Sequence, residues 1–176
     1  MTHMQADALI LRVAGGDMAA LEELYNALAK QVYAYALSLS QNRQTAEDVM
    51  QDTFVRVYSG AKKFRPQRFG VAWIMRIARN LTMDALSRKS STYEPLDENI
   101  DSAASVEDTA VDKTVISDAV SRLSESEREV FVLHAVSGMK MNEIAQMLDQ
   151  PEGTVKWRHS QALKKMKKYI GTEVAQ

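Results

Sequence analysis

The feature that most constrains the fold is a pair of adjacent helical patterns in the last third of the chain. Apolar residues recur at helical spacing in Met141–Leu148, turn-forming residues follow in Asp149–Gly153, and a second helical pattern comes next. Pro151 suits the first turn of this second helix, and Gly171 suits its end. Residues 153–170 contain six basic groups and no acidic one. The pattern predicts a helix-turn-helix whose second helix lies against DNA phosphates.

The second helical pattern has two different faces. Its apolar face, which is expected to pack on the rest of the protein, contains Val155, Ala162, Met166 and Ile170. The polar and cationic residues predicted to contact DNA are Thr154, Lys156, Trp157, Arg158, Ser160, Gln161 and Lys164. A solvated basic helix in an ordinary helical bundle would show the same charge run, so this segment alone leaves that alternative open.

The residue types present exclude several kinds of site. The chain has no cysteine, which rules out disulfides and thiolate zinc sites and favours a reducing, cytoplasmic location. Its histidines, His3, His134 and His159, stand at no metal-binding spacing, and no cofactor is expected. The sequence shows no catalytic constellation and no glycine-rich phosphate loop, so an enzyme is not expected.

No membrane segment is expected either. The longest apolar runs fall well short of the roughly 18 residues that a membrane span requires. Asp7 and the break at Gly15–Asp17 interrupt the early apolar run, which argues against a signal peptide.

Charge is arranged in blocks, although the net charge is only −1. Residues 1–59 carry −3, residues 60–89 carry +7, residues 90–112 carry −7 and residues 113–176 carry +2. Two basic blocks around an acidic spacer indicate two DNA-facing modules. The spacer contains Pro95 and several Ser and Thr residues and lacks a sustained helical stripe. We therefore predict an all-α protein with two small helical domains, 1–90 and 113–176, joined by a flexible acidic linker at 91–112.

The first domain opens with two long amphipathic patterns. The first follows the N-cap candidate Asp17, and its expected core stripe is Leu21, Tyr25, Leu28, Val32, Tyr35 and Leu39. The second, from Ala46 to Val57, places Asp48, Gln51 and Asp52 together on its polar side. Two carboxylates without a basic neighbour indicate a docking face, although a solvated helix surface would contain the same residues.

Basic and aromatic residues alternate between Gly60 and Gly70. Pro66 prevents a regular helix through the middle of this segment, which contains Lys62, Lys63, Phe64, Arg65, Arg68 and Phe69. Rings flanked by cations bind single-stranded bases, at about 1–3 kcal/mol per stacked base. A further helix, from about Val71 to Arg88, would place Trp73, Arg76, Arg79 and Asn80 beside this loop. Trp73 on its own would more often be a partly buried core residue.

Six segments carry a family resemblance. Ala20–Tyr25 (ALEELY), Ala46–Phe54 (AEDVMQDTF) and Trp73–Leu81 (WIMRIARNL) resemble region 2 of the bacterial extracytoplasmic-function sigma factors, which belong to the sigma-70 family. Leu123–Phe131 (LSESEREVF), Glu143–Ala145 (EIA) and Gly153–Lys156 (GTVK) are similar to region 4. These motifs span nearly the whole chain and occur in the family's order, with the family's acidic spacer between them.

The resemblance implies a promoter-specificity subunit of bacterial RNA polymerase. Region 2 would dock on the coiled coil of the polymerase's largest subunit through Asp48, Gln51, Asp52 and Arg56. The melted −10 strand would be bound by Lys62, Lys63, Phe64, Arg65, Arg68, Phe69, Trp73, Arg76, Arg79 and Asn80. Region 4 would place its second helix in the −35 major groove. The polymerase flap and an anti-sigma factor are further implied partners.

The −35 helix departs from the family's usual residues. Arginines are common at the positions of Gln161 and Leu163, a small residue at Trp157 and a leucine at His159. We still predict that Gln161 recognises a base, because glutamine makes a bidentate contact to adenine. His159 lies one turn after Val155 on the apolar stripe and is expected to pack rather than to contact DNA.

Two helix starts in the second domain are also predicted. Ser124 and Glu127 form the sequence of a capping box. Lys140 stands where Ser or Thr would cap the next helix, so that start is expected to rely on Asn142.

A different function remains compatible with the last third of the chain alone. A dimeric helix-turn-helix regulator would bind duplex DNA without polymerase. Dependence on polymerase distinguishes the two functions, since a repressor would leave a footprint unaided.

Overall fold

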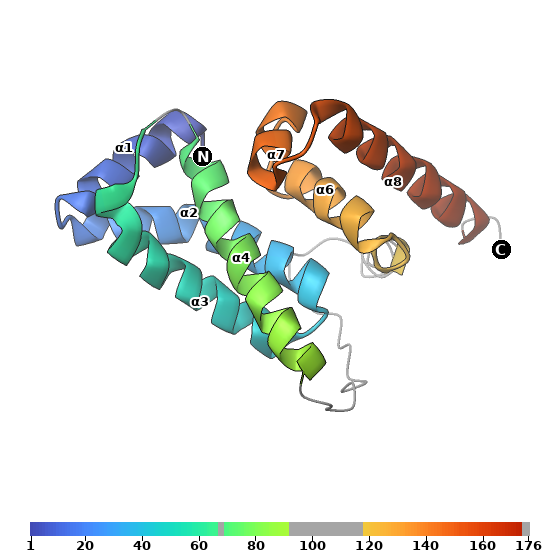
Figure 1. Ribbon diagram of the computed structural model, residues 1–176, viewed down its shortest axis with the longest axis horizontal. Helices are drawn as coiled ribbons and strands as arrows, with labels where there is room; N and C mark the ends of the chain where they lie inside the picture. Colours follow the sequence, from blue (N-terminus) through green and yellow to red (C-terminus); the bar gives the residue numbers. More distant parts are fainter. Residues whose placement is uncertain (67–68, 92–117, 174–176) are drawn as a thin grey trace.

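The structure is a computed structural model that describes residues 1–66, 69–91 and 118–173. These residues form helices and no strand, as predicted for an all-α chain, and Figure 1 shows the helices in two groups. The first group contains α1 (His3–Ala14), α2 (Met18–Ser40), α3 (Arg43–Gly60), the 3-10 turn η1 (Ala61–Lys63) and α4 (Gly70–Ser91). The second contains α6 (Glu125–Ala135), α7 (Met141–Leu148) and α8 (Glu152–Glu173).

The expected linker, 91–112, lies outside the described residues except for Ser91, the last residue of α4. Among the described helices, none combines the length and the apolar character needed to cross a membrane.

Side-chain caps determine where the first three helices begin. The side chains of Thr2, Asp17 and Asn42 each accept a hydrogen bond from the backbone amide three residues later, at 3.2, 3.1 and 2.8 Å. The predicted cap at Asp17 is thus confirmed. The Ala20 amide, followed by the Arg12 side chain, lowers the pKa of Asp17 below its ordinary value, so the cap carries its negative charge at the positive end of α2.

Helix α2 is the central helix of the first group, but its core face is centred differently from the predicted stripe. Its buried residues are Ala20, Leu24, Leu28, Val32, Tyr35, Ala36 and Leu39. Leu24 is fully buried, whereas Tyr25 is 40% exposed and its ring meets the edge of Phe54 at 5.0 Å. Leu21 is only partly buried. The i, i+4 spacing of Ala20, Leu24 and Leu28 selects this face, and a tyrosine at its border keeps its hydroxyl in water.

A glycine is required where α4 begins. A Cβ atom on Gly70 would lie 2.7 Å from the Asp7 carboxylate and 2.8 Å from the Ala6 side chain on α1. The absence of a side chain therefore allows α1 and α4 to approach closely at this crossing.

The second group is the predicted helix-turn-helix, preceded by α6 and by a helical turn at residues 118–121. The apolar face of α8 is confirmed, since Val155, Ala162 and Met166 are buried. The predicted end of this helix at Gly171 is wrong, because α8 continues to Glu173. A glycine costs about 1 kcal/mol in a helix, which the last turn tolerates.

The two predicted starts in this group have different outcomes. The Ser124 backbone amide donates to Glu127 at 3.1 Å, as the capping box requires. The expectation that Asn142 caps α7 is wrong, because the Lys140 amide donates instead to the Glu143 carboxylate at 2.8 Å. Glu143 lies three residues after Lys140, and its side chain reaches back as the second half of a capping box does.

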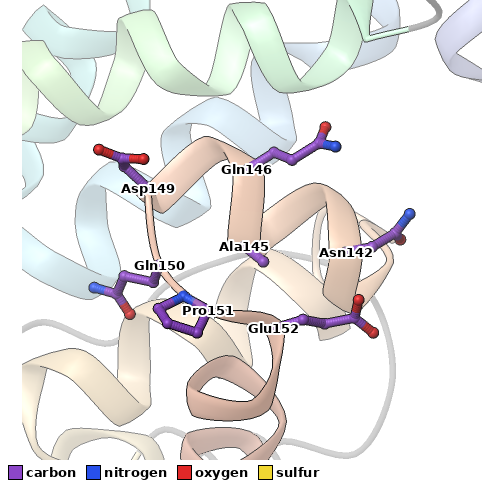
Figure 2. A pocket seen from close by; sticks show the side chains of 7 residues that line it. All are labelled: Asn142, Ala145, Gln146, Asp149, Gln150, Pro151 and Glu152. Atoms are coloured by element: carbon purple, nitrogen blue, oxygen red, sulfur yellow. The ribbon is translucent and has the colours of Figure 1, made fainter.

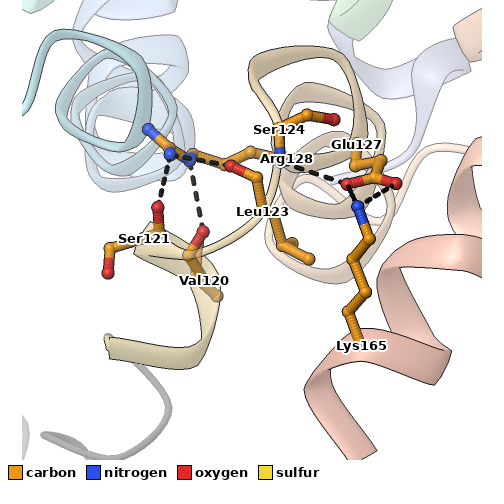
Figure 3. Close-up of polar contacts among 7 residues, drawn as sticks. All are labelled: Val120, Ser121, Leu123, Ser124, Glu127, Arg128 and Lys165. Carbon is orange, nitrogen blue, oxygen red and sulfur yellow. Dashed lines mark hydrogen bonds and ion pairs between the residues drawn. The ribbon is translucent and has the colours of Figure 1, made fainter. Parts of the chain in front are cut away.

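The two groups of helices pack against each other. Helix α6 contacts α2, and α7 contacts α4, so buried residues of both groups belong to one apolar cluster. Arg128 on α6 joins several segments. Its guanidinium donates to the Ser38 carbonyl of α2 at 3.1 Å. It also donates to the carbonyls of Val120, Ser121 and Leu123, as Figure 3 shows. These contacts fix the segment before α6 against the first group.

Candidate nucleic-acid and partner interfaces

Helix α8 presents its predicted DNA side to solvent. Lys156, Trp157, Ser160 and Lys164 are exposed, and Trp157 is 60% exposed. Thr154, Arg158 and Gln161 are half-buried. Helices α6 and α7 lie between α8 and the first group, so this side of α8 faces away from the rest of the protein (Figure 1). The exposed side of α8 thus combines a large aromatic ring with cations.

Two cations near the start of α8 have partners within the motif. Lys156 forms an ion pair with Glu152 at 2.7 Å, and Arg158 donates to the side chain of Gln150. The ion pair spans i, i+4 on an exposed surface and contributes little to stability, so Lys156 can exchange Glu152 for a phosphate at low cost.

A shallow hollow of about 460 Å³ lies at the turn of the motif (Figure 2). It is lined by Asn142, Ala145, Gln146, Asp149, Gln150, Pro151 and Glu152. Asp149 closes α7 in the left-handed conformation, with φ of 53°, and Glu152 begins α8. Because these two carboxylates repel phosphate, the cationic contacts to DNA are expected further along α8.

His159 packs inside the second group, as predicted. Its ring stacks on Phe131 at 6.4 Å and meets His134 edge-on at 4.8 Å. The Nδ1 atom of His134 lies 2.8 Å from the Met139 carbonyl oxygen. Burial, and then the neighbouring His134, lower the pKa of His159 below its ordinary value. The neutral ring is therefore the form that fits the α6–α8 contact.

The basic loop before α4 contains both exposed and buried side chains. Lys62, Lys63 and Arg65 are exposed, but Phe64 is only 8% exposed and its ring lies 5.0 Å from that of half-buried Trp73. The ring of Phe64, a residue predicted to bind the −10 strand, is thus buried against Trp73 of α4 in this structure. Phe69 is half-buried, and Arg68 lies outside the described residues.

Two arginines predicted to bind the −10 strand contact the second group instead. Arg79 donates from Nε to Glu129 of α6 at 2.8 Å, and Arg76 donates to the Gln146 carbonyl of α7 at 2.6 Å. Burial by itself would lower the pKa of Arg79, but the Glu129 carboxylate outweighs it and raises that pKa. Asn80 is exposed.

A cavity of about 540 Å³ lies between the basic loop and α7. Its first wall contains the rings of Phe64, Phe69 and Trp73 with the cations Lys63, Arg65 and Arg76, and its second wall contains Glu143, Gln146 and Met147. Single-strand sites use such a combination of rings and cations. Here α7 forms one side of that space.

The acidic side of α3 is open to solvent. Asp48, Gln51, Asp52 and Arg56 are all exposed, and Asp48 accepts a hydrogen bond from Gln44 at 2.9 Å. The same side continues with two large apolar residues that the sequence reasoning missed, Val55 at 64% exposure and Tyr58 at 50%. Val55 follows Gln51 by four residues and Tyr58 follows Val55 by three, so extending the polar side by two turns would have found them.

Family models match both parts of the chain. The model of sigma-70 region 2 matches residues 24–92, and the model of sigma-70 region 4 matches residues 113–166. Among curated proteins, the chain is 30% identical over 174 residues to the ECF RNA polymerase sigma factor SigM of Mycobacterium tuberculosis, covering 96% of this chain and 87% of that protein. It is 27% identical over 184 residues to the ECF RNA polymerase sigma factor SigW of Bacillus subtilis, covering 96% and 98%.

Two solved structures have a similar fold. CnrH in complex with the cytosolic domain of CnrY gives a TM-score of 0.73 at 24% identity, covering 96% of this chain and 98% of that one. The sigma factor RpoE in complex with the anti-sigma factor NepR, from Bartonella quintana, gives a TM-score of 0.71 at 22% identity, covering 85% and 96%.

Proposed function

Because this chain belongs to the extracytoplasmic-function sigma factors of the sigma-70 family, we propose that it binds the core of bacterial RNA polymerase and directs it to particular promoters. The observation that carries this function is the presence of both sigma regions in one chain, in the family's order. The alternative, a dimeric helix-turn-helix regulator, accounts for the second match only and leaves the region 2 match at residues 24–92 without a role.

The proposed division of labour follows the two groups of helices. Residues 1–90 form region 2, residues 91–112 the linker and residues 113–176 region 4. Sigma factors are DNA-binding regulators, and we propose that this one catalyses no reaction itself and needs no cofactor. Its place of action would be the cytoplasm, where RNA polymerase works.

Polymerase docking is assigned to the exposed side of α3. Asp48, Gln51, Asp52 and Arg56 would contact the coiled coil of the largest subunit, with Val55 and Tyr58 as the apolar part of the contact. Acidic residues beside exposed apolar ones support this assignment, since charge steers the encounter and apolar burial gives affinity. The flap of the polymerase would be the second contact, made by region 4.

The −10 strand is assigned to the basic loop and α4. Lys62, Lys63 and Arg65 are exposed and would contact phosphates of the strand. The residues that line the cavity beside them would bind a base that has been flipped out of the stack. In this role Arg76, Arg79 and Asn80 would follow the strand along α4. Phe64 would pack against the Trp73 ring and hold it in place, and would not itself stack on a base.

The −35 element is assigned to α8. Lys156, Arg158 and Lys164 would contact phosphates, while Trp157, Ser160 and Gln161 would face base edges in the major groove, with Thr154 at the entry. The exposed Trp157 ring suits the methyl group of a thymine, and Gln161 suits an adenine.

An anti-sigma factor is the remaining proposed partner. CnrH was solved with the cytosolic domain of CnrY and RpoE with the anti-sigma factor NepR, and both have the fold of this chain. A partner of that kind would hold the protein away from polymerase until a stimulus arrives.

Run-off transcription tests the proposed function. Purified core polymerase is incubated with a library of randomised promoters, with and without this protein. We expect transcripts that depend strictly on the protein and share two spaced elements. A footprint by the protein alone, with no dependent transcript, would establish the dimeric regulator instead.

A further inference from the structure

Region 4 contacts the surface of region 2 that is proposed to bind the −10 strand. The centre of the contact is Glu129, whose side chain is only 8% exposed. One of its oxygens accepts hydrogen bonds from the Tyr35 hydroxyl and from Arg79 Nε, each at 2.8 Å. Tyr35 is fully buried on α2, and α4 supplies Arg79. A buried carboxylate with two donors from the other region is a specific contact, since either partner alone would be costly to bury.

Three further contacts surround this one. Arg76 donates to the Gln146 carbonyl near the C-terminal end of α7, where the helix dipole is negative. His3 Nε2 lies 3.1 Å from the Glu143 carboxylate. Arg128 donates to the Ser38 carbonyl. All four contacts join region 2 to α6 or α7, and none involves α8 or the acidic side of α3.

Oxygens of region 4 accept hydrogen bonds from two arginines that the proposed function assigns to the −10 strand. Arg76 and Arg79 each meet an oxygen of α6 or α7, and Glu143, Gln146 and Met147 wall the cavity beside the basic loop. A strand cannot use these arginines and this cavity while α6 and α7 occupy them.

We infer that the α6–α7 surface, carrying Glu129, is a ligand of region 2 within the same chain and competes with single-stranded DNA for Arg76 and Arg79. This inference rests on the proposed −10 function of α4. While the two regions are in contact, the acidic side of α3 and the DNA side of α8 stay exposed. Docking on polymerase through α3 therefore precedes the separation of the two regions, and only then does the −10 surface become free.

A distance measurement tests the inference in the full chain. Because the sequence has no cysteine, the exposed residues Glu22 and Ala135 can be changed to Cys and labelled with a donor and an acceptor dye, one in each region. Glu129→Gln removes the charge at the contact. Glu47→Gln is the matched control, because it removes an exposed carboxylate from α3 and Glu47 is not among the residues that join the two regions.

We expect Glu129→Gln to lower the energy transfer between the dyes. It should also tighten binding of a labelled single strand of mixed sequence by about tenfold, because one charged hydrogen bond changes the equilibrium between contacting and separated regions by about that factor. Glu47→Gln is expected to change neither quantity. If the two variants behave alike in both assays, or if the dyes separate without any gain in strand affinity, the competition does not exist.

The doubly labelled protein with Glu129 intact provides a second measurement that requires no change at the contact itself. Unlabelled single strand, and separately core polymerase, should each lower the energy transfer; an unchanged signal at saturating strand would overturn the inference. Run-off transcription separates the two hypotheses. If polymerase-dependent transcription occurs while Glu129→Gln has no effect, the closure is refuted and the sigma function stands. If the opened variant gains strand affinity but no transcription, the closure stands and the sigma function is refuted.

Discussion

Replacing Glu127 with Ala should lower the free energy of unfolding by about 0.5–3 kcal/mol, because this side chain combines a helix cap with an ion pair. It accepts the Ser124 amide at 3.1 Å, and Lys165 of α8 donates to its two oxygens at 2.8 and 2.7 Å (Figure 3). Loss of a cap costs about 0.5–2 kcal/mol. The ion pair adds about 1 kcal/mol at most, because the Lys165 side chain is 53% exposed.

Two companion variants separate these contributions. Lys165→Ala removes the ion pair and keeps the cap, so it should cost clearly less than Glu127→Ala. Glu125→Ala removes an exposed carboxylate from the same first turn and should stay within about 0.5 kcal/mol of wild type. Urea unfolding followed by far-UV circular dichroism at pH 7 measures all three. If Lys165→Ala costs as much as Glu127→Ala, the cap has no share and the reasoning is refuted.

The contribution of Glu127 should also depend on pH. Burial by itself would raise the pKa of Glu127, but the hydrogen bonds from Lys165 and Ser124 outweigh it and hold the pKa below the ordinary value of 4.5. A carboxylate of this kind stabilises the fold above its ordinary pKa, and the contribution is lost as pH falls through the pKa of the folded state. The difference in unfolding free energy between wild type and Glu127→Ala should therefore be largest at pH 7 and should shrink as the pH falls below 4.5.

Three further predictions concern the interfaces and the histidine pair. Gln161→Ala should cost about 1–3 kcal/mol of discrimination at one −35 position, whereas Lys164→Ala should weaken binding to all promoter variants; equal losses everywhere for both would contradict the assignment, and anisotropy on a set of single-base variants measures it. Asp48→Ala with Asp52→Ala should weaken association with core polymerase in a pull-down and leave the melting temperature unchanged, and undiminished capture would show a merely solvated surface. The unfolding free energy should fall as pH drops below 6.5, because His159 resists protonation in the fold; His159→Leu should reduce that fall in urea titrations, and an identical pH slope would disprove it.

Local features of this fold were predictable from the sequence because they depend on neighbouring residues. The cap at Asp17, the capping box at Ser124 and the apolar face of α8 all arise from spacings of a few residues. The same kind of reasoning failed at Gly171, where a helix tolerated a residue that often ends one.

Contacts between distant parts of the chain were not predictable. Tyr35 and Glu129 are 94 positions apart, and nothing in either helical pattern assigns one to the other. Arg79 was placed correctly on the same helix as Trp73, but charge alone does not distinguish a phosphate from a carboxylate of the same chain as its partner. The buried position of Phe64 likewise depends on the path of the loop before α4, which single-sequence patterns do not determine.

The two tryptophans of the chain give its two proposed DNA surfaces separate optical signals. Trp73 is half-buried beside Phe64 in the first group, whereas Trp157 is 60% exposed on α8. Indole emission shifts to shorter wavelength in an apolar environment, so the two rings should emit at different wavelengths. Iodide should quench Trp157 strongly and Trp73 weakly. Duplex binding at one surface and strand binding at the other should then be visible separately in the unlabelled protein.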